Sequence, residues 1–220
     1  KGGDISILSG KSGSGNGGII LLNAGDSSSL GNSAGIKIAT GGSEKSNSGN
    51  IHIKSGKANA LSGSIKLHSG DGIEGSGQVE VESGSSSAGV AGRVVLRGGS
   101  SFIGMGASIV LKSGDSEDST GGSINMSSGS STIHKSGSIS LSTGASLSGS
   151  GSGQIGIQTS KSQGGESGGV YISTGSAKEN VGGISLLGGN SQAIGGSIKI
   201  KSGSSFVGTG GLILLQSGSG

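Results

Sequence analysis

The sequence contains no cysteine and no proline. Without cysteine the chain can form neither a disulfide nor a thiolate metal site, and without proline no backbone donor is missing from a β-ladder. Aromatic residues make up only 1% of the chain, and the net charge is +3 over 220 residues. So small a charge does not indicate nucleic-acid binding. The sequence also lacks an apolar run long enough to span a membrane and a signal-peptide pattern at its start.

What the sequence has instead is a nine-residue phrase, Gly-Gly-x-Ile-x-Leu-x-Ser-Gly, which recurs fifteen times at steps of 14 to 16 residues. A fixed period is typical of repeat architectures. The first apolar residue of each phrase, which we call the anchor, is always Ile or Val. A second apolar residue follows two positions later, so both side chains are expected on one face of a strand. The predicted core consists of Ile5, Ile7, Ile20, Leu22, Ile36, Ile38, Ile51, Ile53, Ile65, Leu67, Ile109, Leu111, Ile139, Leu141, Ile198 and Ile200.

Three further positions of the phrase follow the same alternation. The small position, two residues before the anchor, is always Gly or Ala, and the hydroxyl position, four residues after it, is mostly Ser or Thr. The next residue, the turn glycine, is Gly in every unit except at Ser160, and we expect it to open a turn in which φ is positive. Apolar residues in the connecting segments share the parity of the anchor and predict a short return strand. They are Leu30, Leu61, Ile73, Val90, Ile103, Ile133, Ile194 and Val207.

This pattern predicts an all-β fold, a thin flattened β-solenoid (β-helix) of about 15 coils of 14–16 residues with parallel in-register stacking. The period of two and the abundance of glycine argue against helix. Disorder is one alternative, because Gly and Ser dominate, although a disordered linker has no reason to keep fifteen β-branched anchors. An antiparallel meander is the other, because the connecting segments are long enough to reverse the chain.

We expect residues 1–220 to form a single continuous repeat segment. The chain begins at Lys1 rather than Met and ends within the repeat pattern, which suggests a piece of a longer protein.

No catalytic, cofactor-binding or metal-binding residue is predicted, and no cofactor is expected. The three histidines do not have metal-ligand spacing. Glu80 and Glu82 share one strand face with basic neighbours, so ion pairs of Lys66 with Glu80 and of Glu82 with Arg97 between stacked coils explain them better than acid–base chemistry does. The glycine-rich turns lack the Gly-x-x-x-x-Gly-Lys-Ser/Thr pattern of a phosphate-binding loop.

Two features indicate contacts with partners. Ile19, Leu21, Leu212 and Leu214 place aliphatic side chains on the face expected to be solvated, which is typical of a contact surface. Self-association, axial or lateral, is therefore expected. The sequon Asn125-Met126-Ser127 makes Asn125 a candidate glycosylation site, so glycans are a further candidate partner.

The phrase, seen most plainly at residues 195–203, resembles the Gly/Ser-rich tandem-repeat proteins of algae and other protists. The resemblance extends over all fifteen units and implies extracellular fibrous or cell-surface material. We therefore expect a structural protein, not an enzyme, in an extracellular fibril, appendage or surface coat built from stacked β-solenoid coils. The alternative is an adhesin-like or ice- or glycan-binding module, which a regular outward column of Thr, Asn or aromatic residues would have favoured.

Overall fold

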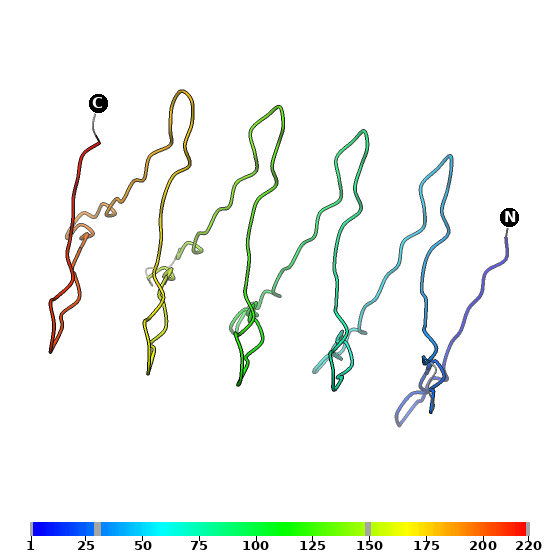
Figure 1. Ribbon diagram of the computed structural model, residues 1–220. Coiled ribbons are helices and arrows are strands. Elements are labelled where there is room, and N and C mark those ends of the chain that lie inside the picture. Colours follow the sequence, from blue (N-terminus) through cyan, green and yellow to red (C-terminus); the bar gives the residue numbers. More distant parts are fainter. Residues whose placement is uncertain (1, 29–31, 148–150, 219–220) are drawn as a thin grey trace. The chain divides into compact units, whose positions relative to one another are not determined.

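The computed structural model describes residues 2–28, 32–147 and 151–218. Within these ranges no residue belongs to an α-helix or a β-strand. The chain instead alternates straight stretches, which carry the repeated phrase, with bends in the connecting segments (Figure 1). It divides into two units, Lys1–Leu111 and Lys112–Gly220, which both follow this pattern.

The predicted all-β fold, a β-solenoid of about 15 parallel, in-register coils, is therefore wrong for the described residues. The physical reason lies in the backbone hydrogen bonds. A β-solenoid needs a ladder between equivalent residues of successive coils, 14 to 16 positions apart in this sequence. The described residues instead form eight backbone hydrogen bonds between residues seven to nine positions apart, and each of them closes one connecting loop. Among the described residues, no ladder of backbone hydrogen bonds thus joins one straight stretch to another.

The predicted return strand is wrong for the same reason. The connecting segments contain bends where the return strand was expected, as at residues 73–74, 102–104, 132–134 and 206–208. Their apolar side chains project into solvent, and Phe102, Ile103, Phe206 and Val207 are almost fully exposed. Leu30, which belongs to the same set, lies outside the described residues.

The turn glycines also behave differently from the expectation. No glycine in the described ranges has a φ in the left-handed region. A Cβ built on the turn glycines, such as Gly10, Gly84 and Gly114, would meet no atom within 4 Å, so neither φ nor space requires glycine at these positions.

Candidate functional site

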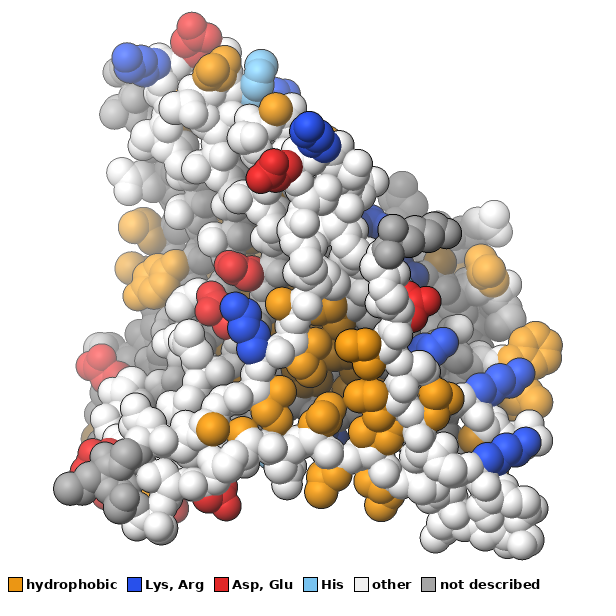
Figure 2. All heavy atoms as spheres, turned by 90° about the vertical axis from the view of Figure 1, so that its right-hand side faces the viewer, with side chains coloured by type: hydrophobic (Ala, Val, Ile, Leu, Met, Phe, Trp, Pro, Cys, Tyr) orange, Lys and Arg blue, Asp and Glu red, His pale blue; other side chains and the backbone are white. Residues whose placement is uncertain are grey.

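The repeated apolar side chains form two rows, which we call the anchor row and the second row. Anchors are about half exposed, from 45% at Ile213 to 55% at Ile36, apart from Ile5. Side chains of the second row are more exposed, from 65% at Met126 to 72% at Leu67, apart from Leu215. The described part of the chain therefore contains no buried hydrophobic core, and all sixteen residues predicted to form one are accessible. Figure 2 shows hydrophobic side chains uncovered on the face that it draws.

The surface area shows how far this chain is from a folded monomer. Its accessible surface is 22790 Å², for a mass of 20.6 kDa. A folded monomer of this mass exposes about 8,900 Å², and a fully extended chain about 30,000 Å². Burial of apolar surface is the main force that stabilises folded proteins. The isolated chain therefore leaves most of its available hydrophobic stabilisation unused.

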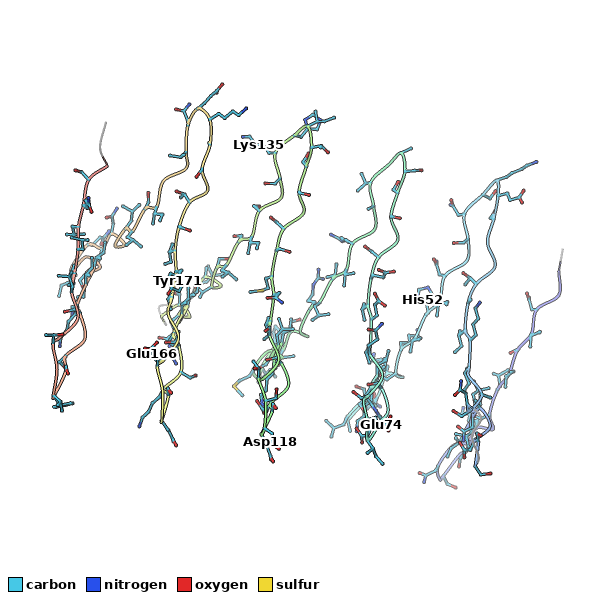
Figure 3. All side chains as sticks on the ribbon, in the orientation of Figure 1. His52, Glu74, Asp118, Lys135, Glu166 and Tyr171 are labelled. Carbon is cyan, nitrogen blue, oxygen red and sulfur yellow. The ribbon has the colours of Figure 1, made fainter. Side chains whose placement is uncertain are left out.

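The four residues predicted to form a contact surface are exposed to solvent. Ile19, Leu21, Leu212 and Leu214 are all well exposed, and so are Tyr171 and Leu187 on other straight stretches. Their exposure therefore does not distinguish these four residues from other apolar residues outside the two rows, and a contact surface at these positions stays a prediction. Figure 3 shows Tyr171 and His52 on straight stretches of the chain.

Asn125 is exposed, as an acceptor for a glycan must be. It sits directly after the anchor Ile124 in a straight stretch. Glycosylation at this position stays a prediction.

Each connecting loop begins at a turn glycine, or at Ser160 in one unit, and ends at the small position. These two residues form the loop base. In the loop 114–122, the N–H of Gly122 donates to the carbonyl oxygen of Gly114 at 2.9 Å. Equivalent bonds of 2.9 to 3.2 Å close the loops 10–18, 25–34, 84–92, 99–107, 129–137, 189–196 and 203–211.

The hydroxyl position takes part in some loop bases. The Oγ of Ser83 donates to the carbonyl oxygen of Gly92 at 2.9 Å, and the Oγ of Ser128 donates to that of Gly137 at 3.1 Å. In stacked coils such hydroxyls would bond from one coil to the next. In the structure they bond across the base of their own loop.

Close approach at some loop bases disfavours a larger side chain at the small position. A Cβ built on Gly18 would lie 3.1 Å from the Cβ of Ser9 and 3.1 Å from the backbone nitrogen of Gly10. The same contact at Gly122 would be 3.2 Å from the Cβ of Ser113. The neighbouring atoms would have to move by a few tenths of an ångström at these loops, whereas a Cβ on Gly63 would make an ordinary contact of 3.8 Å with Ser55.

The two alanines at the small position face residues smaller than serine. Ala34 closes a loop whose hydroxyl position is Ala24, and Ala107 closes one whose hydroxyl position is Gly98. A Cβ built on Gly98 would lie only 2.7 Å from the carbonyl oxygen of Ala107. This pairing by size is not general, because Gly196 closes a loop whose hydroxyl position is Gly188.

A serine seven residues after the anchor, which we call the loop serine, fixes the bend. In the loop 84–92 the Oγ of Ser86 accepts the N–H of Gly89 at 2.9 Å. This is the serine turn in which a hydroxyl substitutes for a backbone acceptor. Loop serines with such bonds are Ser12, Ser43, Ser86, Ser101, Ser116, Ser131, Ser162, Ser191 and Ser205. Sequence reasoning missed this device, although the spacing Gly-x-Ser after the phrase would have revealed it.

Three loops have neither device, and we call them open loops: 56–63, 70–77 and 175–182. In these described segments no base hydrogen bond forms, and the loop serine is replaced by Ala58, Gly72 and Ala177. All three open loops belong to units with a step of 14 residues. We call a loop closed when it has both the base bond and the serine bond. The closed loops are 10–18, 84–92, 99–107, 114–122, 129–137, 189–196 and 203–211.

A hollow lies at the open loop 56–63. It has a volume of about 610 Å³ and is lined by Lys54, Lys57, Ala58 and Ala60, together with small polar residues. No acidic side chain lines it. The hollow is basic and opens widely to solvent.

Charged groups elsewhere make few contacts. Lys112 forms an ion pair with Asp115 at 2.6 Å, and both side chains are mostly exposed, so the pair contributes little to stability. The predicted pairs of Lys66 with Glu80 and of Glu82 with Arg97 are absent from the described residues. Figure 3 shows Glu74, Asp118 and Lys135 at loops.

Within the described ranges, no three His, Asp or Glu side chains come together as metal ligands would. None of the described residues belongs to a helix of the length and apolar character that a membrane crossing needs.

Comparisons with protein-family models, with curated proteins and with solved structures found no match. The resemblance to algal and protist repeat proteins therefore stays a prediction.

Proposed function

We propose that this chain is a structural protein that assembles with further copies of itself into an extracellular fibril, appendage or surface coat. The observation that carries the proposal is the exposure of the two apolar rows. The chain leaves 22790 Å² accessible, about two and a half times the area of a folded monomer of its mass. Contact with other copies would bury these rows.

A second copy is a suitable partner because every copy offers the same rows at the same period. The small position beside each anchor has no side chain larger than a methyl group, so two chains can approach closely along the rows. Burial of one Ile or Leu side chain contributes about 1.5 to 3 kcal/mol, and fifteen units repeat that contribution along the chain.

We place the assembly outside the cell because the composition resembles that of extracellular repeat proteins and because Asn125 offers an exposed glycan acceptor. Mass spectrometry of the native material before and after enzymatic deglycosylation tests this part. An N-glycan at Asn125 supports it, and an unmodified Asn125 in the native material counts against a glycosylated coat.

Electron microscopy with matched variants tests the assembly. Ile109→Ser combined with Ile139→Ser removes two anchors and should raise the concentration needed for assembly at least about tenfold, because two buried side chains contribute more than 1.4 kcal/mol. The control Val110→Ser changes the opposite face of the same straight stretch and should have a smaller effect. If the double variant and the control raise the concentration needed for assembly equally, the anchor row does not form the contact between copies.

A further inference from the structure

The basic hollow at the open loop 56–63 has the size of a binding site. Its volume of about 610 Å³ falls within the range of roughly 300 to 1,000 Å³ that is typical of ligand sites. Lys54 and Lys57 give it positive charge, while Ala58 and Ala60 give it apolar surface. The hollow therefore suits a chain segment that carries both acidic side chains and an apolar side chain.

The next open loop, 70–77, has that chemistry. It carries Asp71 and Glu74 around the almost fully exposed Ile73. Within the described part of the chain neither carboxylate forms an ion pair. The loop tip is narrow, because a Cβ built on Gly72 would collide with the carbonyl oxygen of Gly75.

The two loops do not pair within one chain, because no ion pair joins their side chains among the described residues. They lie at opposite ends of the straight stretch 63–70, and at about 3.3 Å per residue their bases are roughly 20 Å apart. The acidic loop that we place against the basic hollow is therefore that of another molecule.

We propose that the acidic loop 70–77 of one copy docks into the basic hollow at 56–63 of a second copy. This inference rests on the proposed self-assembly and names a contact within it. The two partners in the contact are different surfaces of the same chain, so each added copy leaves a free loop and a free hollow for the next one. Such a head-to-tail contact extends a filament unless its rotation closes a ring.

Charge-reversed variants of the full chain test the contact. Lys54→Glu with Lys57→Glu makes the hollow acidic, and Asp71→Lys with Glu74→Lys makes the loop basic. Each variant alone should need about tenfold more protein to assemble than the wild type, because like charges then face each other. An equimolar mixture of the two variants should assemble within about twofold of the wild type, because each surface again meets its opposite.

Two controls carry the same charge changes at other loops. Glu117→Lys with Asp118→Lys matches the basic variant, and Lys135→Glu with Lys161→Glu matches the acidic one. Both should assemble within about twofold of the wild type, since their charges lie outside the contact.

Two results would overturn the contact and leave the proposed self-assembly unaffected. In the first, each reversed variant alone assembles at the same protein concentration as the wild type. In the second, the mixture assembles no better than either variant alone. A wild-type chain that does not assemble at any concentration overturns both.

Discussion

The loops 84–92 and 56–63 connect the same phrase and yet differ in how they are held. In the first, Gly92 bonds to Gly84 at 3.2 Å and the Oγ of Ser86 accepts the N–H of Gly89 at 2.9 Å. In the second, Ala58 replaces the loop serine and no base bond forms among the described residues. The two loops also differ in length, by one residue, and in most of their side chains. The loop 189–196 has the same length as 56–63 and is closed, so length alone does not keep a loop open.

The largest expected difference between the two loop classes is in proteolysis. Trypsin must open a closed loop before it cuts, and two hydrogen bonds of about 0.5 to 1.5 kcal/mol each oppose that opening. Cleavage after Lys57, in an open loop, should therefore be about tenfold faster than cleavage after Lys11 or Lys135, in closed loops. A digestion time course followed by mass spectrometry measures this ratio. Equal rates at the three lysines would show that the closed loops open freely.

The close approach at one loop base gives the next effect. Gly98→Ser should break the base of the loop 99–107, because its Cβ would lie 2.7 Å from the carbonyl oxygen of Ala107. Exchange of the Ala107 amide hydrogen should then become about fivefold faster, which corresponds to the loss of one hydrogen bond of about 1 kcal/mol. Adding Ala107→Gly should not slow the exchange of that amide again, because this change keeps the carbonyl oxygen that the new Cβ meets. Recovery in the double variant would mean that the methyl group of Ala107, and not its carbonyl oxygen, opposes a side chain at position 98.

Removal of one loop serine should have a similar but more local effect. Ser86→Ala deletes the acceptor of the Gly89 N–H and should speed exchange of that amide about threefold to fivefold. The neighbouring Ser87→Ala is the control and should leave the Gly89 amide unchanged. Nuclear magnetic resonance of both variants tests this, and identical exchange in the two would exclude the hydroxyl as the acceptor.

The smallest expected effect is the closure of an open loop. Ala58→Ser supplies the missing hydroxyl in a unit of 14 residues, the length at which Ser191 already bonds to the N–H of Ala193 at 3.1 Å. Cleavage after Lys57 should slow about twofold to threefold, since one hydrogen bond of less than about 1 kcal/mol is gained. If the rate does not change, a difference other than the missing serine keeps the loop open.

The sequence predicted the period of the repeat and the positions of the phrase and its connecting segments. It failed on the β-solenoid, because alternation such as Ile109, Val110, Leu111 predicts which residues share a face but does not specify which segment pairs with which. Pairing depends on hydrogen bonds between distant residues, and in the described chain those bonds close loops instead. The loop serine was predictable from its Gly-x-Ser spacing. The close approach of Gly18 to Ser9 was not, because it depends on the three-dimensional path by which the chain returns at the loop base.

The candidate contact residues show the same division. Ile19 and Leu214 are exposed, but the anchors of the opposite parity are exposed too, so the exposure of these two residues does not test the predicted contact surface. The hollow at 56–63 was not predicted, because the way in which Lys54, Lys57, Ala58 and Ala60 come together follows from the path of the chain and not from a sequence motif.

Sedimentation velocity of the wild-type chain over a wide concentration range tests the central claim, that copies of the chain assemble. We predict that the sedimentation coefficient rises with concentration and falls again on dilution, as reversible assembly requires. A single species of 20.6 kDa at every concentration would contradict it.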